Sequence, residues 1–85
     1  MAVLSIDELK GFLLRAVGED ETIDLSGDIL DSPLADLGFD SLAVIATTSA
    51  LEQHFGIKLG DEDASDIETP RDFLDVFNRR LAHAA

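Results

Sequence analysis

Ser41 is the residue whose surroundings could do chemistry, because it follows an aspartate at the predicted start of a helix. The run Gly38-Phe39-Asp40-Ser41-Leu42 ends a long connection, and helical periodicity begins directly after it. The Asp40 carboxylate can accept the unpaired N–H groups of the first helical turn. A phosphodiester on the Ser41 hydroxyl would lie at the positive end of the helix dipole, near free N–H donors. Gly38 permits a backbone conformation closed to other residues and leaves room for a modifying enzyme.

Other chemistries fit the sequence less well. Ser41 lacks the G-x-S-x-G elbow of a serine hydrolase, and the absence of cysteine excludes disulfides and thiol catalysis. The segment 61–72 has part of the spacing of a calcium loop, but Asp66 stands where the required glycine would be. We therefore expect no catalytic residue and no metal site, and we interpret the many carboxylates as a solvated acidic face.

Start and stop signals predict the helices that must position Ser41. Ser5 and Glu8 form a capping box for a first helix that ends at Gly18. The serine helix runs from residue 41 to residue 55 and is closed by Gly56. Acidic residues 61–63 favour a short third helix, and Thr69-Pro70 starts the last one.

Residues 19–40 form the long connection between the first two helices. This connection contains eight acids and no base. A structureless loop of this length is unusual in a compact domain. Its apolar residues predict an ordered loop that packs back on the helices: Leu25, Ile29, Leu30, Leu34 and Leu37. The expected fold is an all-α single domain over residues 1–85, a small four-helix bundle with three long helices and one short.

Composition limits the partners and the location. Eighteen acids against six bases give a formal net charge of −12, which disfavours nucleic acid and favours enzymes with basic docking surfaces. No apolar run approaches the roughly 20 residues that span a bilayer, and no signal peptide is visible. We expect a cytoplasmic monomer that does not associate with membranes.

The serine helix has two apolar arcs at helical spacing. One arc holds Val44, Leu51 and Phe55, flanked by Thr47 and Thr48, and is the predicted core face. The opposite arc adjoins Ser41 and is apolar where a surface helix should be polar, which predicts a partner-docking stripe: Leu42, Ile45, Ala46 and Ser49. The alternative, that both arcs are buried, remains open at this stage.

Nearly the whole chain resembles the acyl carrier proteins. The resemblance is carried by G-x-D-S-L at 38–42, F-G-I-x-L at 55–59, D-E-D at 61–63 and the T-P start of the last helix. Within that family the chain is similar to the discrete carriers of bacterial aromatic (type II) polyketide synthases. The shared features are the run 24–28, Leu42-Ala43 after the serine, and residues 69–75 leading to Asn78.

The resemblance implies a carrier and not an enzyme. Ser41 would bear a covalent 4′-phosphopantetheine, with Gly38, Asp40 and Leu42 around it, and would hold growing polyketide intermediates as thioesters. The implied partners are a phosphopantetheinyl transferase, a malonyl transferase, a ketosynthase with its chain-length factor, a ketoreductase and cyclases. A fatty-acid synthase carrier and an unmodified acidic helical adaptor are the alternatives.

Two groups of residues complete the predicted site. Acids beside the stripe are expected to steer partners: Asp36, Glu52, Asp61 and Glu62. Many family members carry a glutamate five residues after the serine, where this chain has Ala46. The acyl-chain cavity is expected to include Val44, Thr47, Thr48 and Leu51 from the serine helix. The resemblance adds Arg71 and Asn78, which would give this cavity a polar side.

Overall fold

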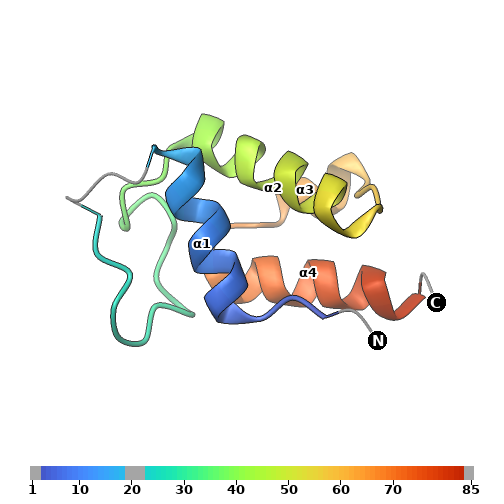
Figure 1. The fold of residues 1–85 in the computed structure, drawn as a ribbon, viewed down its shortest axis with the longest axis horizontal. Coiled ribbons are helices and arrows are strands. Elements are labelled where there is room, and N and C mark those ends of the chain that lie inside the picture. The colour runs from blue at the N-terminus through green and yellow to red at the C-terminus, as the bar shows by residue number, and fades with distance from the viewer. Residues whose placement is uncertain (1–2, 19–22, 84–85) are drawn as a thin grey trace.

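The computed structural model describes residues 3–18 and 23–83, and it confirms an all-α fold. The helices are α1 (Ile6–Ala16), α2 (Ser41–Phe55), α3 (Asp61–Ser65) and α4 (Pro70–His83). No strand occurs within these ranges. In Figure 1, α2 lies above α4, α1 rises from the level of α4 to that of α2, and the loop before α2 covers one end of the molecule. No helix in the described ranges has the length and apolar character needed to cross a membrane.

The predicted capping interactions set the helix boundaries. Ser5 Oγ accepts the Glu8 N–H at 3.2 Å at the start of α1. Thr69 Oγ1 accepts the Asp72 N–H at 3.2 Å, and the Asp72 carboxylate accepts the Thr69 N–H at 3.1 Å, which is a reciprocal capping box at α4. Gly56 ends α2 in the left-handed conformation, with φ of 68°.

The long connection packs as an ordered loop over its described part, residues 23–40, as predicted. Leu25, Ile29 and Leu34 are buried in the core. Two backbone hydrogen bonds join the loop to the α3–α4 connection and to the start of α4, from Leu34 N–H to the Glu68 carbonyl at 2.8 Å and from Arg71 N–H to the Leu30 carbonyl at 2.9 Å. The acids at 19–21 lie outside the described residues.

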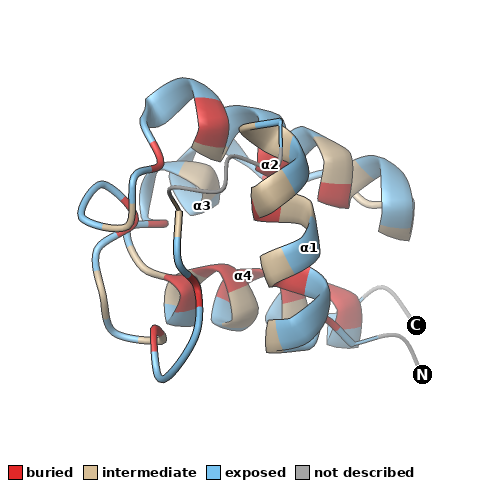
Figure 2. Ribbon diagram, turned by 60° about the vertical axis from the view of Figure 1, so that its left-hand side comes forward, coloured by how far each residue is buried: buried red, intermediate tan, exposed pale blue. Residues whose placement is uncertain are grey.

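The buried face of α2 differs from the predicted one. Its buried residues are Ala43, Thr47, Thr48 and Leu51, whereas Val44 and Phe55 are only half-buried. The threonine hydroxyls donate to helix carbonyls one turn earlier, Thr47 to Ala43 at 2.8 Å and Thr48 to Val44 at 2.9 Å. Burial of a paired hydroxyl costs little, so a face of small and polar residues can point inward. Buried and exposed positions alternate along each long helix in Figure 2.

Candidate functional site

Ser41 is the first residue of α2 and is exposed. Asp40 precedes it as the N-cap, and its carboxylate accepts the Ala43 N–H at 2.8 Å. The Asp40 carbonyl accepts the Val44 N–H at 3.0 Å, so the amides of Ser41 and Leu42 are left without an intrahelical acceptor. The hydroxyl therefore stands at the positive end of a 15-residue helix.

Gly38 allows the loop to reach this helix start. Its φ is 101°, and a Cβ at this position would lie 3.3 Å from Cγ1 of Ile23. A side chain would be strained in this backbone conformation and would press on the loop wall. The sequence-based reason for glycine is confirmed for the backbone, and the close approach of Ile23 adds a second reason.

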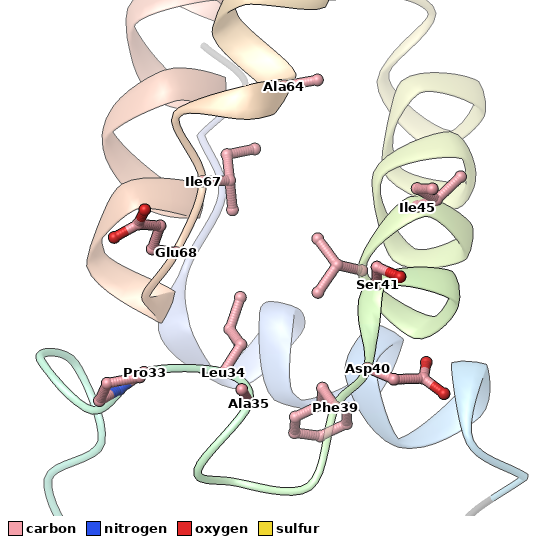
Figure 3. A pocket seen from close by; sticks show the side chains of 11 residues that line it. Pro33, Leu34, Ala35, Phe39, Asp40, Ser41, Ile45, Ala64, Ile67 and Glu68 are labelled. Carbon is pink, nitrogen blue, oxygen red and sulfur yellow. The ribbon is translucent and has the colours of Figure 1, made fainter.

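An open apolar cavity of about 430 Å³ lies beside Ser41. Its walls come from the loop, α2, α3 and the α3–α4 connection, and Figure 3 shows Leu34 and Ile67 directed into the space between them. The lining residues are Pro33, Leu34, Ala35, Phe39, Asp40, Ser41, Val44, Ile45, Ala64, Ile67 and Glu68. We call this space the first hollow.

A second hollow of about 280 Å³ continues along α2 away from Ser41. It shares Val44, Ile45 and Ala64 with the first hollow. Its other lining residues are more polar: Thr48, Ser49, Glu52, Lys58, Leu59 and Asp61. The two hollows are neighbours along α2, and we call the pair the depression beside α2 and α3.

Most of the predicted cavity residues do not line this depression. Val44 lines both hollows and Thr48 lines the second, but Thr47 and Leu51 belong to the fully buried core. Asn78 holds the chain before α1, since its Oδ1 accepts the Leu4 N–H at 2.6 Å and its Nδ2 donates to the Leu4 carbonyl at 3.1 Å. The expected cavity role of Asn78 is therefore corrected to a structural one.

Arg71 is also placed away from the hollows, contrary to the expectation. Its guanidinium donates two hydrogen bonds to Asp31, from Nε to Oδ1 at 2.7 Å and from Nη2 to Oδ2 at 3.1 Å. Both side chains are largely exposed. This bidentate pair, with the backbone hydrogen bond from Arg71 to Leu30, joins the start of α4 to the loop whose next residues line the first hollow.

Acid titration should report this ion pair. The hydrogen bonds from Arg71 hold the pKa of Asp31 below its usual 3.8. A lowered folded-state pKa means that the pair stabilises the loop above the ordinary aspartate pKa and that this stabilisation is lost as the pH falls through the folded-state value. Arg71→Gln should return the Asp31 titration, measured by carboxyl carbon NMR, to the ordinary value. Arg79→Gln on the same helix is the control, and an Asp31 titration unaffected by Arg71→Gln would contradict the prediction.

The predicted docking stripe is exposed. The alternative, in which both apolar arcs of the serine helix are buried, is therefore wrong. Leu42 is 74 % exposed and Ile45 is 61 % exposed, and Ala46 and Ser49 are also exposed. An exposed apolar surface beside a polar rim is a common feature of interaction sites. Whether this stripe docks partners stays a prediction.

The four acids that the sequence predicts to steer partners differ in burial. Asp36, Asp61 and Glu62 are exposed, as expected of charges that attract a partner. Glu52 is half-buried, and its Oε2 accepts the Leu59 N–H at 2.7 Å. The carboxylate thus holds the 56–60 connection against α2, which is a structural contact that the sequence did not predict, and its steering role stays a prediction.

Sequence reasoning missed much of the first hollow. Phe39 is 2 % exposed and lies between Gly38 and the cap residue, where an apolar side chain packs against the fourth helical position as a hydrophobic staple. Val44 occupies that fourth position and lines the same hollow. This spacing could have identified Phe39, but Ala64 and Ile67 come from a distant segment and have no comparable local signal.

Asp40→Ala should destabilise the protein by about 1 kcal/mol, because the Ala43 amide loses its cap. Urea unfolding should show a lower midpoint with an unchanged slope. Asp36→Ala is the matched control, since Asp36 is an exposed aspartate in the same loop and caps no helix. Equal midpoints for the two variants would show that the cap contributes nothing to stability.

Comparison with known proteins agrees with this geometry. A model of the phosphopantetheine attachment site family matches residues 11–77. The chain is 42 % identical over 83 residues to the actinorhodin polyketide synthase acyl carrier protein of Streptomyces coelicolor, covering 98 % of this chain and 96 % of that one. It is 45 % identical over 85 residues to the granaticin polyketide synthase acyl carrier protein of Streptomyces violaceoruber, with 100 % of each covered.

Solved structures give the same result. The actinorhodin carrier from Streptomyces coelicolor bearing a 3,5-dioxohexyl triketide mimic matches with a TM-score of 0.87 and 42 % identity, covering 99 % of this chain and 98 % of that one. The oxytetracycline acyl carrier protein matches with a TM-score of 0.86 and 36 % identity, covering 100 % of this chain and 90 % of that one. At these identities the likeness extends beyond the fold.

Proposed function

The chain belongs to the polyketide synthase acyl carrier proteins with a phosphopantetheine attachment site, and from this premise we propose that Ser41 is the attachment residue. The protein is a carrier and not an enzyme, and its prosthetic group is a covalent 4′-phosphopantetheine. Growing polyketide intermediates are held as thioesters on this arm and delivered to the enzymes of the synthase. A fatty-acid synthase carrier and an unmodified adaptor are not favoured.

The observation that carries the assignment is an exposed serine hydroxyl at a capped helix start beside an open apolar cavity. Ser41 meets both requirements of a tethering residue, since its oxygen is accessible and its backbone is held by Asp40. The helix dipole favours the negative charge of a phosphodiester there. The arm supplies the thiol that forms the thioester, which this chain of no cysteines does not itself provide.

The first hollow fits the proximal part of an arm and its chain. Its rim includes Ser41, and its walls are mainly apolar side chains such as Leu34, Phe39 and Ile67. Residence of an apolar chain in this hollow would remove its surface from water, which is favourable at about 25 cal/mol per Å². Resting against the protein would also shield the thioester from solvent until an enzyme takes it.

Docking through the stripe would bring partner enzymes to Ser41. Leu42 and Ile45 supply the apolar contact, and Asp36, Asp61 and Glu62 supply charges that steer a basic surface. The synthase enzymes we propose as partners are a malonyl transferase, a ketosynthase with its chain-length factor, a ketoreductase and cyclases. A phosphopantetheinyl transferase must bind the same region first, since it modifies Ser41.

Intact mass tests the proposed function. The chain incubated with coenzyme A and a phosphopantetheinyl transferase should gain the mass of one phosphopantetheinyl group, and the product should then accept a malonyl group from a malonyl transferase. Omission of coenzyme A is the control. An unchanged mass with several active transferases would instead favour the unmodified adaptor.

A further inference from the structure

The lining of the second hollow is more polar than that of the first, which is mainly apolar. Thr48 and Ser49 come from α2, and Lys58 and Asp61 come from the connection to α3 and from α3 itself. The two hollows share Val44, Ile45 and Ala64, so the second hollow lies next to the first, which has Ser41 on its rim. Whatever occupies the second hollow therefore meets hydrogen-bonding groups.

Most polar groups of the second hollow are committed or can only accept. Thr48 Oγ1 donates its proton to the Val44 carbonyl at 2.9 Å. The Leu59 amide donates to Glu52 at 2.7 Å. The carboxylates of Glu52 and Asp61 are acceptors when ionised. Among the lining side chains, donors for a ligand carbonyl are therefore the Lys58 ammonium and the Ser49 hydroxyl.

Lys58 is the one cation among the residues that line the second hollow. The carboxylate contacts with basic side chains within 4.0 Å in the described ranges join Glu8 to the His54 imidazole and Asp31 to Arg71, so no carboxylate there holds the Lys58 ammonium at that distance. Glu52 and Asp61 line the same hollow and attract the ammonium toward it. Lys58 is exposed and lines this hollow, and its ammonium has three donors that no carboxylate in the described ranges holds within 4.0 Å.

We propose that Lys58 is a specificity-determining residue whose ammonium donates a hydrogen bond to a keto oxygen of the chain that occupies the second hollow. The inference rests on the proposed function, because the chain is taken to be attached at Ser41. A keto-rich chain has acceptors along its length and a saturated chain has none beyond its thioester. A hydrogen bond from a charged donor is stronger than one between neutral groups, so the interaction favours keto-rich chains.

The arm itself has amide carbonyls that could accept the same hydrogen bond from Lys58. Three loaded forms distinguish the two sources: the arm alone, the arm with a saturated chain, and the arm with a 3-oxo chain of equal length. Nitrogen NMR of the Lys58 ammonium and amide shifts of residues 48–61 would be recorded for each. We expect the 3-oxo form to perturb these signals more strongly than the other two.

Lys58→Met tests the residue itself, and Lys10→Met is the matched control because Lys10 lies on α1 and lines neither hollow. We expect Lys58→Met to lower the ratio of molecules with the 3-oxo chain inside the second hollow to those with the chain outside it about fivefold. Loss of one hydrogen bond from a charged group at a partly exposed site would have this effect. The saturated chain should be unaffected by either substitution.

Each outcome decides the inference. If the arm alone perturbs the NMR signals as much as the 3-oxo form does, the Lys58 ammonium donates to the arm's amide carbonyls. If the saturated chain perturbs them equally, the chain contacts the hollow without recognition of its keto group. Either result overturns the proposal. So would equal effects of Lys58→Met and Lys10→Met. Mass measurement of each sample separates the premise, because failure to load overturns the proposed function, whereas a loaded protein with unselective shifts overturns only the role of Lys58.

Discussion

Ser41→Ala is expected to abolish phosphopantetheinyl modification completely. The substitution removes the oxygen that must form the phosphodiester bond and leaves the Asp40 cap in place, because that cap is made to the Ala43 amide. Alanine is also the best helix former, and position 41 is exposed, so α2 should form as before. Intact mass after incubation with coenzyme A and a transferase should show one added group for the wild type and none for the variant.

Ser49→Ala is the matched control for this experiment. Ser49 is another exposed serine of α2, and its replacement by alanine should leave the modification of Ser41 unchanged. Circular dichroism of both variants should equal that of the wild type. Added mass in the Ser41→Ala protein would show that another hydroxyl bears the arm and would refute the site assignment.

Ile45→Asp is expected to slow acyl transfer to a ketosynthase by about tenfold or more, the effect of removing one central apolar contact and burying a charge at an interface. Ile45 is 61 % exposed, so an aspartate there should be tolerated by the fold. The rate of transfer would be measured from fully loaded protein at concentrations below saturation of the enzyme, so that weaker docking is observed directly.

Gln53→Asp introduces the same charge on the same helix and is the control, since Gln53 is exposed and lines neither hollow. Ile45 also lines both hollows, and NMR of the loaded variant would show whether the chain has left them. If Ile45→Asp unfolds the protein, the stripe is part of the core and the docking model is wrong. Equal rates for Ile45→Asp and Gln53→Asp would also contradict docking through Ile45.

The helix boundaries could be predicted from the sequence because the signals that set them are local. Caps and terminators act within a few residues, so Ser5, Asp40, Gly56 and Thr69 marked their helices correctly in advance. The same locality placed Ser41 at the first position of α2 and predicted an exposed stripe beside it. Family resemblance then identified the kind of group that such a serine bears.

Polar side chains were the main source of error. Helical phase predicts Thr47 at the flank of the core face, whereas the residue is fully buried, with its hydroxyl paired within its own helix. Glu52, which the sequence predicts as a rim charge, is half-buried and also accepts the Leu59 amide. Hydrophobicity and helical phase do not report whether a polar group finds a partner, and that pairing decides whether burial is costly.

The sequence by itself determined the helices, the capped serine and the exposed apolar stripe, because each depends on neighbours within a turn or two. Only the tertiary structure decided the partners of Arg71 and Asn78, which lie 40 and 74 residues away. It also decided the two hollows, whose walls come from the loop, α2 and the region of α3. Contacts between distant segments depend on how the whole chain packs, and no local pattern encodes them.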